Sequence, residues 1–228
     1  MSQFKFTIDG QECTAAPGQT ILQAARDNDI FIPVLCNMKE LIPAGACRVC
    51  TVKVAGKYMT ACTTPAREGM VVENMTDAIN DKRKSIIEML FAEGNHFCPA
   101  CEKSGNCELQ ALGYYFNMMV PRFPYLFPSK EIEAFSNILI DHNRCIQCKR
   151  CVYAIKTKDD KNIFQMKNRG GKRKVTVAKK LEAKLTPELA AKAMENCPVG
   201  AILKKEVGWV DPIGTRKYDK KPIDQIKV

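Results

Sequence analysis

The stretch "CIQCKRC", residues 145–151, places a cysteine at every third position. These three cysteines are Cys145, Cys148 and Cys151. A fourth, Cys197, follows much later and stands directly before Pro198. The intervening "TPELAAKAMEN" predicts a helix that ends at Cys197, because Thr186 is a good N-cap residue and Pro187 suits the first helical position. Such a helix would carry the distant cysteine back to the triplet.

The chain has 228 residues, of which 46% are hydrophobic and twelve are cysteines, so it can bury a substantial core. Its first ten residues, "MSQFKFTIDG", lack the long apolar run of a signal peptide. No segment approaches the roughly 18–20 apolar residues of a membrane span. We therefore expect a cytoplasmic protein, whose thiols stay reduced and serve as metal ligands rather than as disulfides.

Zinc and iron–sulfur clusters are the two metal centres that compete for these cysteines. Structural zinc sites usually show two close pairs of ligands separated by a modest spacer. The triplet C-x2-C-x2-C with a remote Cys-Pro is instead the pattern of [4Fe–4S] ferredoxins. The third group of cysteines therefore predicts a [4Fe–4S] cluster.

A second group lies in "GNHFCPACEKSGNC", residues 94–107, which holds Cys98, Cys101 and Cys107. A cubane normally needs four protein ligands, and His96 is the fourth candidate in this loop. In the alternative interpretation, His96 caps the preceding helix, and water or Glu102 completes the site.

A first group comprises Cys36, Cys47, Cys50 and Cys62. It lies among segments that predict a small α+β unit: a hairpin turning at Asp9-Gly10, a helix with Thr20 and Gln23 in capping-box positions, and two strands around Gly56. The order of these strands and this helix resembles a plant-type ferredoxin of the β-grasp fold, and this resemblance predicts a [2Fe–2S] cluster. The small residues 44–46 would let backbone N–H groups approach its sulfurs.

Three segments follow from these groups. Residues 1–76 are expected to form the [2Fe–2S] ferredoxin-like domain. Residues 77–128 are expected to hold the histidine- and cysteine-containing [4Fe–4S] segment, with a helix from Thr76 or Asp77 to Gly94 and a proline-rich connector. Residues 129–228 are expected to form an α+β [4Fe–4S] domain with a basic hairpin turning at Gly170-Gly171. The tail 207–228 is expected to extend from this domain and dock on a partner subunit.

The remaining features have plain interpretations. Cys13 is expected to be a small buried apolar residue, and His142 to lie at the surface or beside a ligand. The basic run 167–174 is expected to be a solvated face or a contact with an acidic partner. The formal net charge of +10 alone would also suit a zinc-stabilised nucleic-acid-binding module. No phosphate-binding glycine motif or nucleophile–base pair is present, so neither a catalytic residue nor a substrate site is expected on this chain.

The order of the three groups resembles the N-terminal iron–sulfur region of the large peripheral subunit of complex I. The stretches "FAEGNHFCPACEKSGNCELQALGY" and "CPVGAILKKEVGWVDPIGTRKYDKKPI" are similar above all to the gamma (diaphorase) subunits of soluble NAD-reducing nickel–iron hydrogenases. The resemblance covers essentially the whole chain. One departure is that the usual His-x3-Cys spacing is His-x-Cys here.

The resemblance implies one [2Fe–2S] and two [4Fe–4S] clusters. Their ligands would be, in turn, Cys36, Cys47, Cys50 and Cys62; His96, Cys98, Cys101 and Cys107; and Cys145, Cys148, Cys151 and Cys197. It implies a subunit that relays single electrons between a nickel–iron hydrogenase module, with its small and large subunits, and an FMN/NAD-binding diaphorase subunit. It implies neither nucleic-acid binding nor a membrane span. The equivalent subunit of an NAD-dependent formate dehydrogenase or of a complex I-type NADH dehydrogenase is the alternative in the same class.

Overall fold

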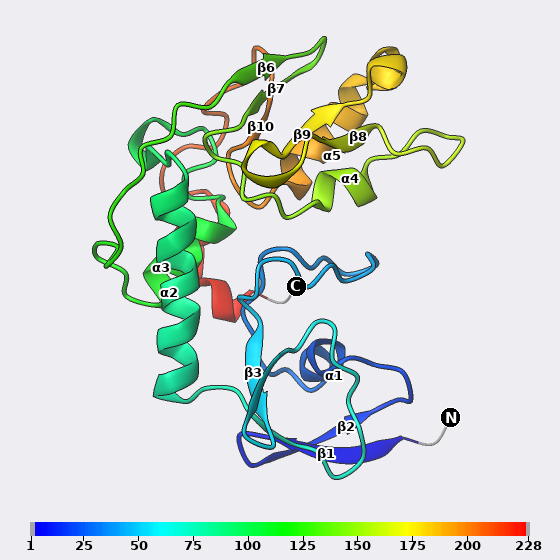
Figure 1. The fold of residues 1–228 in the computed structure, drawn as a ribbon, viewed down its shortest axis with the longest axis vertical. Helices are drawn as coiled ribbons and strands as arrows, with labels where there is room; N and C mark the ends of the chain where they lie inside the picture. The colour runs from blue at the N-terminus through cyan, green and yellow to red at the C-terminus, as the bar shows by residue number, and fades with distance from the viewer. Residues whose placement is uncertain (1–2, 227–228) are drawn as a thin grey trace.

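The computed structural model describes residues 3–226, and their first part folds as a five-stranded sheet with one helix across it (Figure 1). Its elements are β1 (Phe4–Ile8), β2 (Gln11–Ala15), α1 (Ile21–Asp27), β3 (Thr51–Val54), β4 (Lys57–Thr60) and β5 (Val71–Glu73). The strand order is β2-β1-β5-β3-β4, and β1 and β5 are a parallel pair among antiparallel neighbours. This is the expected β-grasp arrangement.

Local sequence signals explain where α1 begins. The Thr20 side chain accepts a hydrogen bond from the Gln23 N–H, and the Gln23 side chain accepts one from the Thr20 N–H. The two residues therefore form the predicted capping box. Ile21 and Leu22 then face the sheet and are buried. The helix closes one face of the sheet over an apolar core.

The middle of the chain is built on the long helix α2 (Asp77–Glu93), which runs from the sheet to the other half of the molecule (Figure 1). Thr76 caps its N-terminus and Gly94 follows its last residue, as predicted. A short 3-10 turn, η1 (Cys98–Ala100), and helix α3 (Glu108–Tyr115) follow. The proline-containing connector after α3 contains no helix, and Arg122 ties it to Asp81 and Glu88 of α2.

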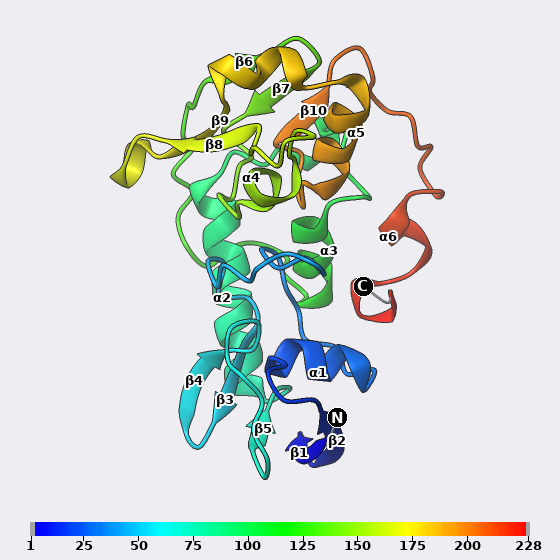
Figure 2. The ribbon, with the colours of Figure 1, turned by 90° about the vertical axis from the view of Figure 1, so that its right-hand side faces the viewer.

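The last part contains a three-stranded sheet of order β10-β7-β6 and a separate hairpin. Its elements are β6 (Ile132–Ala134), β7 (Ile138–Asp141), α4 (Arg150–Ala154), β8 (Phe164–Lys167), η2 (Gly170–Lys172), β9 (Lys174–Val177), η3 (Lys179–Lys184), α5 (Pro187–Asn196) and β10 (Ile202–Lys204). The hairpin β8–β9 turns at the predicted glycines, and its end projects from the body of the molecule (Figure 2). Helix α5 begins after its Thr186 cap and ends directly before Cys197, as predicted.

The C-terminal tail differs from the expectation of an extended arm. It returns along the molecule through α6 (Lys217–Lys220) and η4 (Ile223–Gln225), and Ile223 is buried in the core. The Tyr218 N–H donates to the Gly105 carbonyl at 2.9 Å, and the Arg216 guanidinium donates to the Ser104 carbonyl at 3.1 Å. The expected extension is therefore wrong, because residues 216–223 bind back to their own chain, while Trp209, Val210 and Ile213 stay exposed. Its docking on a partner stays a prediction.

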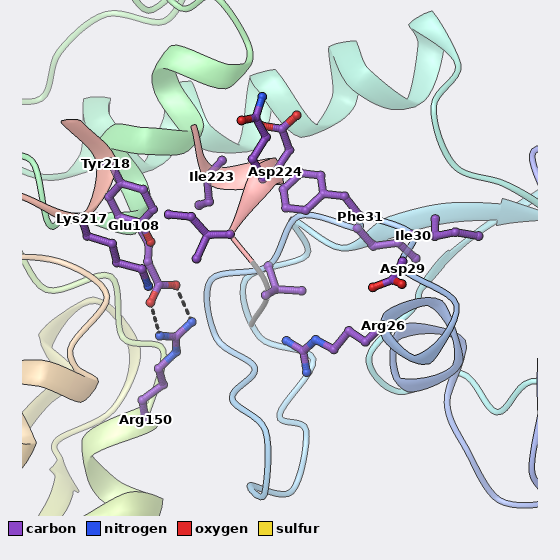
Figure 3. Close-up of a pocket in the computed structure, with 14 residues that line it drawn as sticks. Arg26, Asp29, Ile30, Phe31, Glu108, Arg150, Lys217, Tyr218, Ile223 and Asp224 are labelled. Atoms are coloured by element: carbon purple, nitrogen blue, oxygen red, sulfur yellow. Dashed lines mark hydrogen bonds and ion pairs between the residues drawn. The ribbon is translucent and has the colours of Figure 1, made fainter. Parts of the chain in front are cut away.

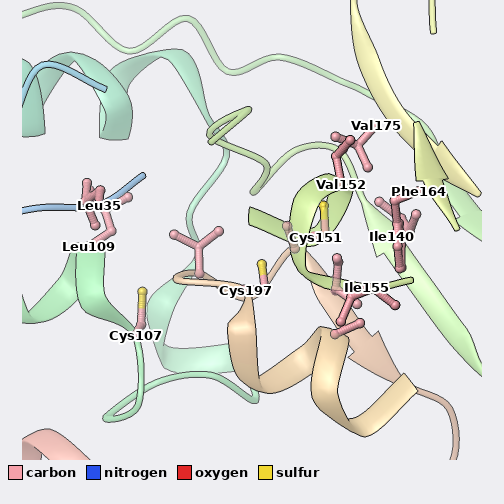
Figure 4. Packing of buried hydrophobic residues seen from close by; sticks show 14 of the residues in the cluster. Leu35, Cys107, Leu109, Ile140, Cys151, Val152, Ile155, Phe164, Val175 and Cys197 are labelled. Atoms are coloured by element: carbon pink, nitrogen blue, oxygen red, sulfur yellow. The ribbon is translucent and has the colours of Figure 1, made fainter. Parts of the chain in front are cut away.

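The buried apolar residues form two cores. One lies under the five-stranded sheet, and the other joins the middle and last parts of the chain and also takes in Leu35 and Val49 from the first part. Figure 4 shows Leu35 beside Leu109 within this second core. Among residues 3–226, no helix is long and apolar enough to cross a bilayer.

Candidate metal centres

The first group of cysteines lies in loops at the edge of the five-stranded sheet. Cys36, Cys50 and Cys62 are buried, and Cys47 is partly exposed. The backbone N–H groups of Ala46 and Cys47 hydrogen-bond to the Cys36 sulfur, which agrees with the role expected for the small residues 44–46. The structure thus brings the four predicted residues into one place.

Crowding sets the acidity of these thiols. Hydrogen bonds from Cys47 and Cys62 lower the pKa of Cys36, whereas the same contacts raise the pKa of Cys47 and of Cys62. Four thiolates this close repel one another, so the chain alone does not ionise all four at neutral pH. Full deprotonation needs a positive charge among the sulfurs, and this donor set suits an iron–sulfur cluster, whose irons would supply that charge.

The second group lines a tight cavity of about 10 Å³. His96, Cys98, Cys101 and Cys107 all contribute to its wall. Cys107 is the N-cap of α3, and its sulfur accepts the Gln110 N–H at 3.4 Å. Burial raises the pKa of the Cys107 thiol, and the N–H groups of Gln110 and Leu109 at this helix end offset only part of that rise.

His96 lines this cavity, and its ring folds back over Gly94 and donates to the Leu90 carbonyl. A Cβ atom on Gly94 would lie 2.3 Å from the His96 Nε2, so only glycine leaves room for the ring. The ring also packs edge-on against Phe91, with ring centroids 5.3 Å apart. Burial, with help from Arg144, lowers the pKa of His96 to about 4. The imidazole is therefore neutral at pH 7, the form that binds a metal.

Arg144 is a feature of this site that the sequence interpretation missed. Its Nη1 donates to the Cys101 sulfur at 3.5 Å, and its Nε contacts the Asp141 carboxylate at 3.0 Å. A cation here stabilises negative charge on the sulfur. Gly200 leaves room for the Cys101 sulfur at this position, since a Cβ on Gly200 would lie 2.5 Å from that sulfur. The only sequence feature that could have pointed to Arg144 is its position directly before Cys145.

The third group lines another tight cavity, of about 20 Å³. Its wall contains Cys145, Cys148, Cys151 and Cys197, and its other residues are mainly apolar, among them Ile140 and Val199. Burial raises the pKa of Cys145 to about 11 and also raises the pKa of Cys148 and Cys151. As in the first group, a bound cationic centre is what would stabilise these four sulfurs as thiolates.

A buried ion pair ties the second and third groups together. Glu108 follows Cys107 and Arg150 precedes Cys151, and both guanidinium Nη atoms donate to the carboxylate at 2.6 Å (Figure 3). The Glu108 N–H also donates to the Pro198 carbonyl at 2.8 Å. Figure 3 shows this pair on one side of an open groove, with Arg26 of α1 on the other. The two cysteine-containing loops are therefore fixed relative to each other by direct polar contacts.

The core that packs around these loops contains or touches sulfurs from all three groups. Cys107, Cys151 and Cys197 belong to it, and Cys47 and Cys145 pack against it. Figure 4 shows Cys107, Cys197 and Cys151 within this one interior. The second and third groups therefore share one apolar environment.

The spacing of the sulfurs bears on the choice between zinc and a cluster. Among residues 3–226, the only three ligand-type side chains whose donor atoms all lie within 4.8 Å of one another are Glu131, Glu133 and His142. A tetrahedral zinc ion would hold its sulfurs roughly 3.8 Å apart. Within residues 3–226, no three cysteine sulfurs all lie that close together, although Cys36 hydrogen-bonds to Cys47 and to Cys62 one at a time. This looser grouping suits a multi-iron centre.

The Glu131–Glu133–His142 group is partly neutralised by one lysine. The Lys174 ammonium contacts both carboxylates, and the His142 Nε2 lies 3.5 Å from a Glu133 oxygen. His142 is buried and lies three residues before Cys145 in the sequence. Cys13 is 1% exposed, as predicted, within the core that also contains Cys50 and Cys62.

Comparison with protein-family models matches three regions of the chain. Residues 2–77 match a 2Fe-2S iron–sulfur cluster binding domain, and residues 83–122 match the NADH-ubiquinone oxidoreductase-G iron–sulfur binding region. Residues 136–203 match the ferredoxin-like domain of NADH-quinone oxidoreductase subunit 3. The chain therefore contains a [2Fe–2S]-type domain and further iron–sulfur regions.

Comparison with whole proteins gives long matches. The gamma subunit of the NAD-reducing hydrogenase HoxS of Cupriavidus necator is 45% identical over 94% of this chain and 93% of its own length. The HndD subunit of an NADP-reducing hydrogenase of Solidesulfovibrio fructosivorans is 34% identical over 92% of this chain, which spans 37% of that protein. A chain in the crystal structure of an NAD⁺-reducing [NiFe]-hydrogenase in the H₂-reduced state superposes with a TM-score of 0.90 at 37% identity, over 98% of this chain and 96% of that chain.

Proposed function

The chain belongs to the family of gamma subunits of NAD-reducing hydrogenases, and from this we propose that it is an iron–sulfur electron-transfer subunit of such an oxidoreductase. It would relay single electrons between a nickel–iron hydrogenase module and an FMN/NAD-binding diaphorase subunit. The observation that carries the proposal is the gathering of twelve side chains, eleven cysteines and one histidine, into three separate groups.

The ligand sets that we propose are those expected from the sequence. Cys36, Cys47, Cys50 and Cys62 would hold one [2Fe–2S] cluster. His96, Cys98, Cys101 and Cys107 would hold one [4Fe–4S] cluster, and Cys145, Cys148, Cys151 and Cys197 a second. When bound, these centres supply one-electron chemistry at iron. The assignment is supported by the two cavities, by the crowded first group and by the neutral imidazole.

The residues of the chain have three tasks in this function. The apolar core excludes water from the second and third groups, so that charge on a cluster is not screened by solvent. Arg144 and backbone N–H groups donate to sulfurs and tune their charge. The Glu108–Arg150 pair and the contacts of α2 fix the distances between groups. The direction of electron flow follows the relative potentials of the partners.

We also propose the organisation that the sequence suggested: domains at 1–76, 77–128 and 129–228, with a basic hairpin and a C-terminal tail in the last. The partners would be the diaphorase subunit and the small and large hydrogenase subunits. A cytoplasmic location is supported by twelve free cysteines, which a reducing compartment maintains.

Anaerobic analysis of the purified chain tests the proposal. We expect about ten irons per chain, two from one cluster and four from each of two others, with matching sulfide and no stoichiometric zinc. The visible spectrum should be brown and broad. A colourless zinc protein would refute the electron-transfer function, and about four irons would remove a whole cubane from the proposal. Identification of co-purifying subunits separates a hydrogenase from a formate dehydrogenase or a complex I-type enzyme.

A further inference from the structure

Arg83 is an unusual residue in this fold, because it is a charged side chain with 0% exposure. It lies on the buried face of α2, near the end of the helix that meets the five-stranded sheet. Its neighbours Lys82 and Lys84 point outward and are at least partly exposed. The pattern of the helix alone would place an apolar residue at position 83.

The guanidinium of Arg83 is satisfied by neutral acceptors. Its Nε donates to the Thr51 carbonyl at 3.0 Å, and its Nη2 donates to the Asn74 Oδ1 at 2.7 Å. Its Nη1 makes a longer contact of 3.4 Å with the Asn80 Oδ1. Among residues 3–226, no carboxylate forms an ion pair with it. The nearby Asp9 carboxylate instead accepts the N–H groups of Asn74 and Met75.

A buried cation without a counter-charge is costly, because the protein interior solvates it poorly. Neutral hydrogen bonds recover only part of that cost. The first cysteine group is the leading anionic candidate, since Thr51 directly follows Cys50. Burial lowers the pKa of Arg83 to about 10, and the charge on Cys50 opposes this shift most, ahead of Tyr115 and Asp9.

We propose that Arg83 is a positioning residue for the centre at Cys36, Cys47, Cys50 and Cys62, and that its buried charge sets the reduction potential of that centre. The inference rests on the proposed function, because it needs a cluster at this site. On reduction the centre gains one electron from a partner's one-electron redox centre, which is oxidised by one electron, and no bond or proton is exchanged. The fixed cation stabilises the added negative charge. It also holds α2 against the sheet through Thr51.

The test compares three variants of the full chain that carry their clusters. Arg83→Met removes the charge and keeps the bulk, Arg83→Lys keeps the charge, and Lys82→Met removes an exposed charge from the next position of the same helix. EPR-monitored redox titration gives the potential of each centre. The two centres of the other cysteine groups are internal controls in every sample.

We expect Arg83→Met to lower the ratio of reduced to oxidised [2Fe–2S] centre at a fixed potential by roughly tenfold or more. Arg83→Lys and Lys82→Met should leave that ratio near the wild-type value, and the other centres should not change. If Arg83→Met loses this centre while Arg83→Lys keeps it at the wild-type potential, the need for the charge is also supported.

An unchanged potential in Arg83→Met with the centre present would overturn the inference. Loss of the centre in both Arg83 variants would also overturn it, since Arg83 would then serve packing alone. A wild-type chain that holds [4Fe–4S] clusters but no [2Fe–2S] centre would instead refute the proposed function of the first group.

Discussion

The pair Glu108–Arg150 should be strongly coupled in stability. The Arg150 side chain is 5% exposed and that of Glu108 is 21% exposed, and two hydrogen bonds of 2.6 Å join them. Burial lowers the pKa of Arg150, but Glu108 more than offsets this and leaves the pKa raised. Replacing Glu108 with Gln therefore leaves a buried cation without its partner.

The magnitude follows from burial. Breaking a fully buried pair by removing one partner costs about 3–5 kcal/mol. Because Glu108 is partly exposed, water reaches the vacated position, and we expect about 2–3 kcal/mol for Glu108→Gln. A chain of this length would then melt roughly 5–10 °C lower. In the double variant Glu108→Gln, Arg150→Met, neither charge is left, so most of that loss should be recovered.

The four proteins of this double-mutant cycle are the wild type, Glu108→Gln, Arg150→Met and the double variant. Their stabilities are measured by anaerobic thermal unfolding, followed by circular dichroism and by the loss of cluster absorption. Lys156→Met in the wild-type background is a matched control, because its pair with Asp160 lies at the surface. Additive effects of the two single changes, or a double variant less stable than Glu108→Gln alone, would refute the reasoning. In either case the two side chains would not be energetically coupled.

Three further results are expected. Arg216→Ala should release the tail. The Tyr218 amide, which donates to the Gly105 carbonyl, should then exchange its hydrogen roughly tenfold faster or more. Unchanged exchange would show that other contacts hold the tail. His96→Cys should keep the cluster of the second group and lower its potential, whereas His96→Ala should destabilise that cluster, and an unaltered EPR signal and potential in His96→Ala would make the histidine only a neighbour. Cys13→Ala should leave iron content unchanged, and a loss of iron would show that this thiol serves a cluster.

Local signals predicted the elements of this fold well, because they depend on residues close in sequence. The capping box at Thr20 and Gln23, the stop at Gly94 and the helix that ends at Cys197 were all predicted and are confirmed. Each rests on hydrogen bonds or steric limits within one helical turn. The grouping of the cysteines was also accessible, since ligand spacing within a loop is local information.

Long-range polar contacts were not predictable in the same way. The sequence gives no reason to join Arg83 to Thr51, which lies 32 residues earlier, or Arg216 to Ser104. The tail was expected to extend because its composition is polar and it has no long helical period. Its polar groups instead pair with the backbone of the loop that holds the second cysteine group. Predicting this pairing requires knowing which carbonyls of that loop lack a partner in the loop itself.

These unpredicted contacts share a physical role. Apolar packing keeps water out but is not directional, so it tolerates small shifts between the parts of a core. A hydrogen bond weakens steeply as its distance and angle change, and it therefore fixes orientation. Arg83 joins the first group to α2, the Glu108–Arg150 pair joins the second group to the third, and Arg216 joins the tail to the second. In a chain that moves electrons between fixed centres, polar joints at the boundaries hold the spacing on which transfer depends, while the apolar core between them provides insulation.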